Sequence, residues 1–337
     1  MGSDLTATSR TLIVAEAAQG HQGDRALLRL LSRAAVAAEA DVVKFQIVYA
    51  DELAAPSYQH YALFRQLEMP DSDWVAGTSE LAKVGMGLAF DVYGPRSLAL
   101  ALELGAAAVK VHATDFFNAE LVDAALRGAP QVFLSAGGIE VSELQAFFIR
   151  HPSAMGKTTL FYGFQAEPTA TADNNLRRLL SLRRRFPELR LGFMDHTDGA
   201  GDEAGWLSAL ALSLGAVAIE KHLTLDRELA LEDYVSALAP GAFRAFVGRV
   251  RAAERALGSE ALELTAVERA YRRRAVKVVT AARVLAPGAE LAPEDLALLR
   301  TALDDRREPL NELARAVGRR LTRSVAIGAA IYVDDLQ

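Results

Sequence analysis

The chain contains no cysteine among its 337 residues. Disulfide bonds and thiol catalysis are therefore excluded, and any metal site has to be built from histidine, carboxylate and water ligands. No apolar run is long enough to span a bilayer, and the N-terminal stretch MGSDLTATSR lacks the apolar segment of a secretory signal. We therefore expect a soluble cytoplasmic protein with no membrane partner.

A dense basic block is also missing. The net charge is −6, and the most basic patch is Arg272 to Arg274 with Lys277 nearby, so we expect no nucleic-acid partner. No G-x-G-x-x-G motif follows the first apolar run, which argues against a dinucleotide site. The chain is 51% hydrophobic, which is enough for a large core and argues against disorder.

Short apolar runs alternate with segments of helical periodicity along most of the chain. Eight such units in roughly 250 residues predict a (β/α)8 TIM barrel, and an open doubly wound sheet is the alternative. The apolar runs that predict strands are 11–15, 41–45, 85–90, 107–113, 131–135, 158–164, 189–194 and 216–219. The clearest helical segments are 25–39, 72–84, 95–104, 203–214 and 240–257.

The pattern changes after the last of these helices. We expect a barrel domain over residues 1–260, a linker over 261–272 and a compact α+β module over 273–337, where short strands alternate with Pro-Gly turns. A module of about 65 residues has a small core and gains from a partner surface. Within the barrel, the connection 47–71 is long and rich in aromatic residues, which is typical of an active-site loop.

Two histidines follow consecutive apolar runs near the end of the barrel domain. His196 follows the run 189–194 by two positions, and His222 follows the run 216–219 by three. Ligands of parallel α/β proteins are held at the C-terminal ends of strands, so these two imidazoles predict a divalent metal site. The alternative is that each histidine caps its strand or pairs with a nearby carboxylate.

Three lysines lie within or just after predicted strands. Lys44, Lys110 and Lys221 are costly to bury unless they are paired or directed at an anion. Pointing inward, they would form a positive pocket for a phosphate or carboxylate. The alternative is structural pairing, with Glu16 and Glu220 as partners. Other polar residues at strand ends are Gln46, Asp91, Asp115, Ser135, Gln165, Glu167 and Asp195, and Asp91 has a second interpretation as a helix N-cap.

These segments resemble motifs of the sialic acid (N-acetylneuraminate) synthase family. The two most specific matches are FMDHTDG with Y-S-D-H-T and AIEKHLTLDR with I-E-K-H-F-T-L-D. The C-terminal segment resembles the family's small antifreeze-like (SAF) domain. Further matches are VAEAAQGHQGD with A-E-I-G-x-N-H-N-G, VVKFQ with V-K-F-Q, AFDVYG with T-P-F-D, VKVHATD with K-I-A-S-G-E, FLSAGG with L-S-T-G-M, and LEDYVSALAP with P-D-H-x-x-S-L-x-P.

The resemblance implies a reaction. Phosphoenolpyruvate condenses with an open-chain aldose, such as N-acetylmannosamine, to give a nine-carbon 2-keto sugar acid and phosphate. By the same resemblance, His196 and His222 bind a divalent metal, Mn²⁺ or Mg²⁺, which polarises the sugar aldehyde. The resemblance also implies a domain-swapped homodimer, in which the small domain of one subunit caps the barrel of its partner.

The resemblance also implies roles for individual residues. Glu16 is expected to orient a sugar hydroxyl or water near the aldehyde, and Asp115 stands where the family has a glutamate with a suspected acid–base role. The expected ligands of phosphoenolpyruvate are Lys44, Lys110, Ser135 and Lys221. The expected contacts to the sugar are Gln46, Asp233 and, from the small domain, Arg306 or Arg307.

Several positions depart from the family motifs. Leu88, Ala113 and Met194 lie where the family directs hydroxyl groups at the phosphate. A lost charge-assisted hydrogen bond costs about 1.5–3 kcal/mol, so phosphate binding requires replacement donors, for which His112 and Gln165 are the candidates. The alternatives are a metal-dependent aldolase or lyase that uses pyruvate, and a degenerate sugar-binding paralogue without activity.

The motif at the sixth predicted strand departs most strongly. The family's H-C-x-S-x-Y-P is replaced by YGFQAEP, so that Tyr162, Gln165 and Glu167 stand where the family has His, Ser and Tyr. A carboxylate at position 167 repels a phosphate if it points at one. The motif therefore predicts either a rebuilt phosphate site or a different donor substrate.

Overall fold

A computed structural model describes residues 10–337, so the polar N-terminal stretch lies almost entirely outside the described residues. The chain divides into two compact units, one that ends at Gly258 and one that covers 259–337. Across residues 10–337, no helix is long and apolar enough to cross a membrane.

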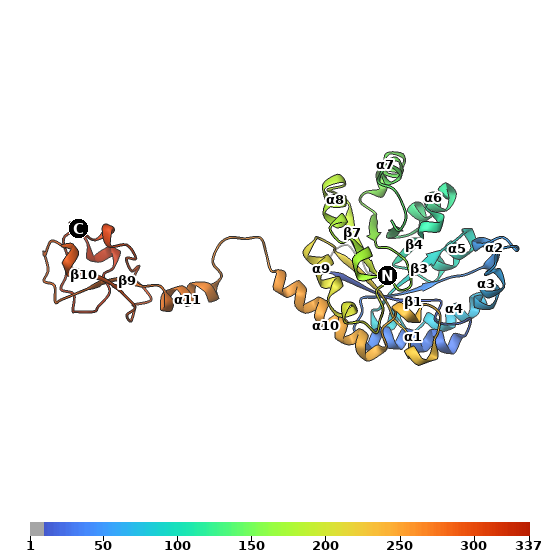
Figure 1. Ribbon diagram of the computed structural model, residues 1–337, viewed down its shortest axis with the longest axis horizontal. Coiled ribbons are helices and arrows are strands. Elements are labelled where there is room, and N and C mark those ends of the chain that lie inside the picture. The colour runs from blue at the N-terminus through green and yellow to red at the C-terminus, as the bar shows by residue number, and fades with distance from the viewer. Residues whose placement is uncertain (1–9) are drawn as a thin grey trace. The chain divides into compact units, whose positions relative to one another are not determined.

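The first unit is a closed barrel of eight parallel strands (Figure 1). Each strand pairs with the next along the chain, and β8 closes the barrel by pairing with β1, where Glu16 lies opposite His222. The (β/α)8 barrel predicted from the sequence is confirmed, and the open sheet is excluded. The strands are β1 (Leu12–Ala18), β2 (Val42–Gln46), β3 (Gly87–Val92), β4 (Ala108–Val111), β5 (Val132–Ser135), β6 (Thr158–Tyr162), β7 (Arg190–Asp195) and β8 (Ala218–His222).

Helices surround the barrel (Figure 1). The first of them begins after Asp24, whose carboxylate accepts hydrogen bonds from the backbone N–H groups of Ala26 and Leu27. The last begins at Pro240, whose fixed φ suits the first helical position. The helices are α1 (Arg25–Ala37), α2 (Ala50–Leu53), α3 (Tyr61–Leu67), α4 (Asp71–Thr78), α5 (Pro95–Glu103), α6 (Ala119–Gly128), α7 (Val141–Arg150), α8 (Arg178–Arg185), α9 (Leu207–Ser213) and α10 (Pro240–Leu257).

Side chains alternate along each strand, so one set fills the barrel and the other packs under the helices. Gly192 leaves space inside for Phe161, whose ring a Cβ at position 192 would meet at 2.6 Å. The interior set is Leu12, Val14, Val42, Ala89, Ala108, Phe133, Phe161, Met194 and Ala218. On β7 the alternation places His196 on the same face as Met194, so the polar strand ends sit directly above this apolar interior.

The second unit, 259–337, has a small core of its own. Helix α11 (Ala266–Ala275) buries none of its side chains. Strands β9 (Val278–Ala281) and β10 (Leu296–Leu299) pair antiparallel. Both strands lie within the stretch 273–337 predicted as a compact α+β module, and α11 covers much of the stretch 261–272 predicted as a linker. Its buried apolar residues include Val279, Leu285, Leu291, Leu310, Leu321, Val325 and Ile331.

Candidate active site

A cavity of about 380 Å³ lies at the C-terminal ends of the barrel strands. This is the end of a TIM barrel at which ligands bind. Leu53 and Phe64, from the connection that carries α2 and α3, form part of the wall, as the interpretation of 47–71 as an active-site loop predicted. The predicted site residues that line the cavity are Glu16, Lys44, Gln46, Lys110, Gln165, His196, His222 and Asp233.

The inner part of the cavity is a buried network of two lysines and three carboxylates. Lys44 pairs with Glu16 and Asp91, and Lys110 donates to Glu220 at 2.6 Å. Each of these five side chains is at most 2% exposed. Burial opposes the charged forms, but Glu220 raises the pKa of Lys110 above its usual value, and Lys110 lowers the pKa of Glu220. The pairing of strand lysines with Glu16 and Glu220, predicted as the alternative to anion binding, is therefore present.

Asp91 has a different role from the helix N-cap that its position allowed. Its carboxylate is fully buried against Lys44, and the residue that precedes α5 is Gly94. The N-cap interpretation is wrong because Asp91 still lies within β3, on the face that points into the barrel.

His196 and His222 lie next to each other at the ends of β7 and β8. Their ring centroids are 5.0 Å apart, with the ring planes at 63°. Burial lowers the pKa of His196 to about 4 and the pKa of His222 well below its usual value. Both imidazoles are therefore neutral at physiological pH, and each keeps a nitrogen lone pair.

These histidines suit a metal ion on chemical grounds. The Nδ1 atom of His196 is buried and has no hydrogen-bond partner within the described chain. Over residues 10–337, no group of three or more His, Asp or Glu side chains is arranged to hold a metal. A metal held here would have two imidazole ligands, and its remaining ligands would come from water or substrate.

A polar wall adjoins the charged network. The side-chain oxygen of Gln46 accepts hydrogen bonds from Nε2 of Gln19 at 2.8 Å and from the hydroxyl of Tyr93 at 2.7 Å. The amide N–H groups of Gln46 remain as donors toward a ligand. Nε2 of Gln165 lies 3.1 Å from Nε2 of His112, so the two candidate replacement donors contact each other.

The sequence reasoning missed two residues of this wall. Tyr93 follows Asp91 by two positions, so continued alternation past the end of β3 was a signal for it. Gln19 lies in the turn after β1, where no periodic signal exists.

Met194 lies among the residues predicted to hold the phosphate. Its sulfur is 3.2 Å from Nζ of Lys110 and 3.9 Å from both Oγ of Ser135 and Nε2 of Gln165. Met194 and Ser135 are both fully buried, and Ser135 does not line the cavity. A thioether is a weak acceptor, so these donors are only partly satisfied.

Lys221 differs from the other two lysines. It alternates with Glu220 and His222 along β8 and so faces away from the barrel interior. Its Nζ donates to Oδ1 of Asp195 at 3.0 Å and to the carbonyl of Thr197 at 2.8 Å. The inward orientation predicted for Lys221 is therefore wrong.

Two further predicted residues lie outside the cavity lining. Asp115 is half-buried and accepts hydrogen bonds from Oγ1 of Thr114 at 3.0 Å and Nδ2 of Asn118 at 3.1 Å. Arg306 belongs to the second unit, where its side chain is 93% exposed and lies 3.9 Å from Asp304.

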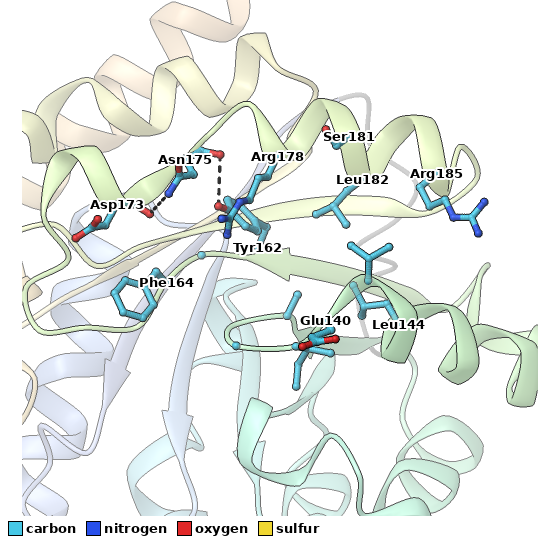
Figure 2. A pocket seen from close by; sticks show the side chains of 15 residues that line it. Glu140, Leu144, Tyr162, Phe164, Asp173, Asn175, Arg178, Ser181, Leu182 and Arg185 are labelled. Atoms are coloured by element: carbon cyan, nitrogen blue, oxygen red, sulfur yellow. Dashed lines mark hydrogen bonds between the residues drawn. The ribbon is translucent and has the colours of Figure 1, made fainter.

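A larger cavity, of about 1020 Å³, lies between α7 and α8. Figure 2 shows Leu144 and Leu182 on its walls, with Tyr162 and Phe164 from the end of β6. Among the described residues that line it there is no histidine and no lysine, and none of the predicted site residues. Its charged lining residues are Glu140, Asp173, Arg178 and Arg185, whereas the histidines and lysines gather in the smaller cavity.

The chain is similar to known proteins over most of its length. The NeuB family model matches residues 31–261. The N,N'-diacetyllegionaminic acid synthase of Legionella pneumophila is 27% identical, over all of this chain and 96% of its own. Human N-acetylneuraminate-9-phosphate synthase is 26% identical, over 93% of this chain and 89% of its own. The N-acetylneuraminic acid (sialic acid) synthetase of Leptospira borgpetersenii, solved in complex with citrate, superimposes with a TM-score of 0.71 and 26% identity, over 79% of this chain and 92% of that one.

Proposed function

Since this chain belongs to the NeuB family, we propose that it condenses phosphoenolpyruvate with an aldose to give a sialic-acid-like (nonulosonic) 2-keto sugar acid and phosphate. The family resemblance inferred from the sequence is confirmed, and the protein is a carbon–carbon bond-forming synthase. The proposed acceptor is an amino sugar of the N-acetylmannosamine type. The observation that carries the proposal is the buried pair Lys44 and Lys110 beside two neutral histidines at the strand ends.

The histidine pair is the proposed metal site. His196 and His222 would hold Mn²⁺ or Mg²⁺, and the bound ion would supply Lewis acidity toward the sugar aldehyde. Their lowered pKa values keep both rings unprotonated, so they need lose no proton on binding a cation.

The lysines are the proposed ligands of the donor. An ammonium group has three N–H donors, and Lys110 uses one on Glu220 and one on the sulfur of Met194. The weak bond to sulfur can be exchanged for one to a substrate oxygen without loss of the ion pair. Glu16 accepts from the backbone N–H of Ala18 and pairs with Lys44, so we propose that it positions Lys44 as well as a sugar hydroxyl.

One observation favours a second candidate function. The sulfur of Met194 lies where the resemblance expects a phosphate ligand, and it already contacts Lys110, Ser135 and Gln165. An aldolase or lyase that uses pyruvate as donor needs no phosphate site. Turnover with pyruvate and none with phosphoenolpyruvate would select this second function.

The second unit is proposed to be a SAF domain and the protein a homodimer. Helix α11 leaves Val267 79% exposed and Tyr271 62% exposed. Two large apolar side chains exposed one helical turn apart favour coverage by a partner. A second subunit is the proposed partner.

The proposed function is tested by incubating the protein with Mn²⁺, phosphoenolpyruvate and a panel of amino sugars and measuring released phosphate. Release that depends on the sugar supports it. Failure to bind phosphoenolpyruvate, together with no release for any aldose, contradicts it.

The metal assignment is tested by titration calorimetry with Mn²⁺ on the variants His196→Ala and His222→Ala. We expect each variant to lose binding, because one imidazole ligand is removed from a site with only two. His60→Ala is the matched control, since His60 is exposed. Unchanged Mn²⁺ affinity in His196→Ala would show that the metal, if any, binds elsewhere.

A further inference from the structure

The segment after β8 carries Asp233 into the active-site cavity. Asp233 lines the cavity with its backbone in the left-handed region, at φ 62°. A residue other than glycine keeps such a conformation only where its surroundings hold it. The residues Tyr234–Ser236 form a single 3₁₀ turn, which is too short to fix its own position. The place of Asp233 therefore depends on what holds the segment 233–238.

The side chain of Arg227 holds this segment. Its Nη1 donates to the backbone carbonyls of Tyr234 at 2.8 Å, Val235 at 2.9 Å and Ala237 at 2.8 Å. Its Nη2 donates to Oδ1 of Asp198 at 3.0 Å. Asp198 follows β7, so one planar guanidinium joins the segment after β8 to the segment after β7.

The segment 233–238 is also bonded to the backbone of both proposed metal ligands. Oγ of Ser236, which is fully buried, donates to the carbonyl of His196 at 2.9 Å. The backbone N–H of Leu238 donates to the carbonyl of His222 at 2.9 Å. Asp233 thus begins a segment whose position is set relative to the ends of β7 and β8.

Gly199 leaves the space that this arrangement needs. A Cβ at position 199 would lie 2.0 Å from the carbonyl oxygen of Ala237 and 2.5 Å from Nη1 of Arg227. The backbone N–H of Gly199 donates to the carbonyl of Val235 at 2.8 Å. Three motifs of the sequence, FMDHTDG, AIEKHLTLDR and LEDYVSALAP, therefore meet at one guanidinium.

Building on the proposed synthase function, we propose that Arg227 is a positioning residue for the acceptor sugar, which acts by holding Asp233 in the cavity. Within residues 10–337, Arg227 does not line the cavity, so it acts through the segment 233–238. Without its hydrogen bonds, the carboxyl group of Asp233 loses the fixed place from which it meets a sugar hydroxyl. The proposed phosphoenolpyruvate ligands Lys44 and Lys110 belong to β2 and β4, so the effect is confined to the acceptor.

Titration calorimetry with Mn²⁺ measures the affinity for the amino sugar of the panel that binds most tightly and, separately, for phosphoenolpyruvate. In Arg227→Gln the sugar affinity should fall about tenfold, the equivalent of one hydrogen bond, and the phosphoenolpyruvate affinity should change by less than about twofold. Gly199→Ala should show the same difference between the two ligands, because its Cβ displaces the same contacts. Arg244→Gln is the control, since Arg244 is exposed on α10 and pairs with Glu39. It should bind both ligands as the unmodified protein does.

A double variant separates positioning from a general structural role. Asp233→Gly removes the carboxyl group and suits the left-handed backbone. When Arg227→Gln is added to Asp233→Gly, the sugar affinity should change little further, because the group that Arg227 holds is already absent. A further loss as large as that of Arg227→Gln alone would overturn the proposal. Equal losses for the sugar and for phosphoenolpyruvate in Arg227→Gln would overturn it too.

The remaining outcomes distinguish this inference from the synthase function. If Arg227→Gln does not fold, Gly199→Ala decides by the same criteria. Sugar affinity that depends on Arg227, without phosphate release by the unmodified protein, would contradict the synthase function and leave the role of Arg227 standing. Phosphate release without that dependence would do the reverse. An unmodified protein that binds no amino sugar would overturn both.

Discussion

At the scale of single residues, Met194 shows how one side chain alters the chemistry available at a strand end. Met194 belongs to the apolar interior of the barrel and extends it to the level of the lysines. Its sulfur accepts hydrogen bonds from Lys110 and Ser135. The sequence alone showed that Met194 departs from the family motif, but the contacts of its sulfur involve residues from three other βα units. Its substitution therefore tests where a phosphate is held.

We expect Met194→Ser to bind phosphoenolpyruvate about tenfold more tightly in the presence of Mn²⁺. The smaller side chain frees Lys110, and the hydroxyl adds a hydrogen bond to a charged group, worth about 1.5–3 kcal/mol. Titration calorimetry measures the change, and Met155→Ser is the control, because Met155 precedes β6 and lies at the other end of that strand from the cavity. An unchanged or weaker affinity would place the phosphate away from position 194.

His21 supports a prediction about pH and stability. It is fully buried, with ring centroids 5.0 Å from Trp74 and 6.5 Å from Phe45. Burial lowers its pKa from 6.5 to about 4. The unfolded chain takes up this proton below pH 6.5 and the folded chain does not until about pH 4. His21 therefore contributes stability that is complete above pH 6.5 and is lost as the pH falls, up to about 3 kcal/mol.

Urea unfolding between pH 7 and pH 4 measures this contribution. His21→Gln should show a shallower loss of unfolding free energy over this range than the unmodified protein, by about the same 3 kcal/mol. His60→Gln, which changes an exposed histidine, should follow the unmodified protein. Parallel curves for His21→Gln and the unmodified protein would rule out the buried neutral state.

At the scale of secondary structure elements, the alternation of side chains along β8 gives neighbouring residues different roles. Glu220 and His222 face the cavity, and Lys221 between them holds Asp195 behind the barrel wall. Asp195 also accepts from Ser208 of α9 at 2.9 Å, so Lys221 belongs to a network that ties β7, β8 and α9 together. Its role is structural.

Lys221→Met should destabilise the protein by about 3 kcal/mol, because Asp195 loses the cation that compensates its buried charge. Its affinity for phosphoenolpyruvate should stay close to that of the unmodified protein. Lys110→Met, at the corresponding place inside the cavity, should lose that affinity. Urea unfolding and calorimetry give the two readouts. If Lys221→Met kept its full stability but lost its affinity for phosphoenolpyruvate, Lys221 would be a substrate ligand after all.

At the scale of the whole molecule, α11 leaves two large apolar side chains exposed, although its Arg273 pairs with Asp305. None of its side chains is buried, and Val267 and Tyr271, four residues apart, share one face. In a homodimer this face gains a partner.

Replacing both Val267 and Tyr271 with Asp should shift the protein from the dimer toward the 36.3 kDa monomer, because the charges oppose burial of the face. Light scattering after size-exclusion chromatography measures the mass. Arg269 lies on the other side of α11, so Arg269→Glu should leave the dimer intact. A monomeric unmodified protein would refute the proposed assembly.

Much of the architecture was determined by the sequence. Periods of two and 3.6 are local properties, so the alternation of apolar runs and amphipathic segments predicted eight βα units. Parallel strands then had to bring their C-terminal ends, with Lys44, Lys110, His196 and His222, to one end of the barrel.

The tertiary structure decided which of the polar residues at those strand ends point into the barrel. Where charged residues follow one another, as in Glu220-Lys221-His222, polarity does not mark the inner face, and the register of β8 against β1 and β7 sets it. The ion pairs Lys44–Asp91 and Lys110–Glu220 also join residues from separate βα units. Such contacts exist only once the barrel has closed, because closure fixes distances between segments that are far apart in the chain.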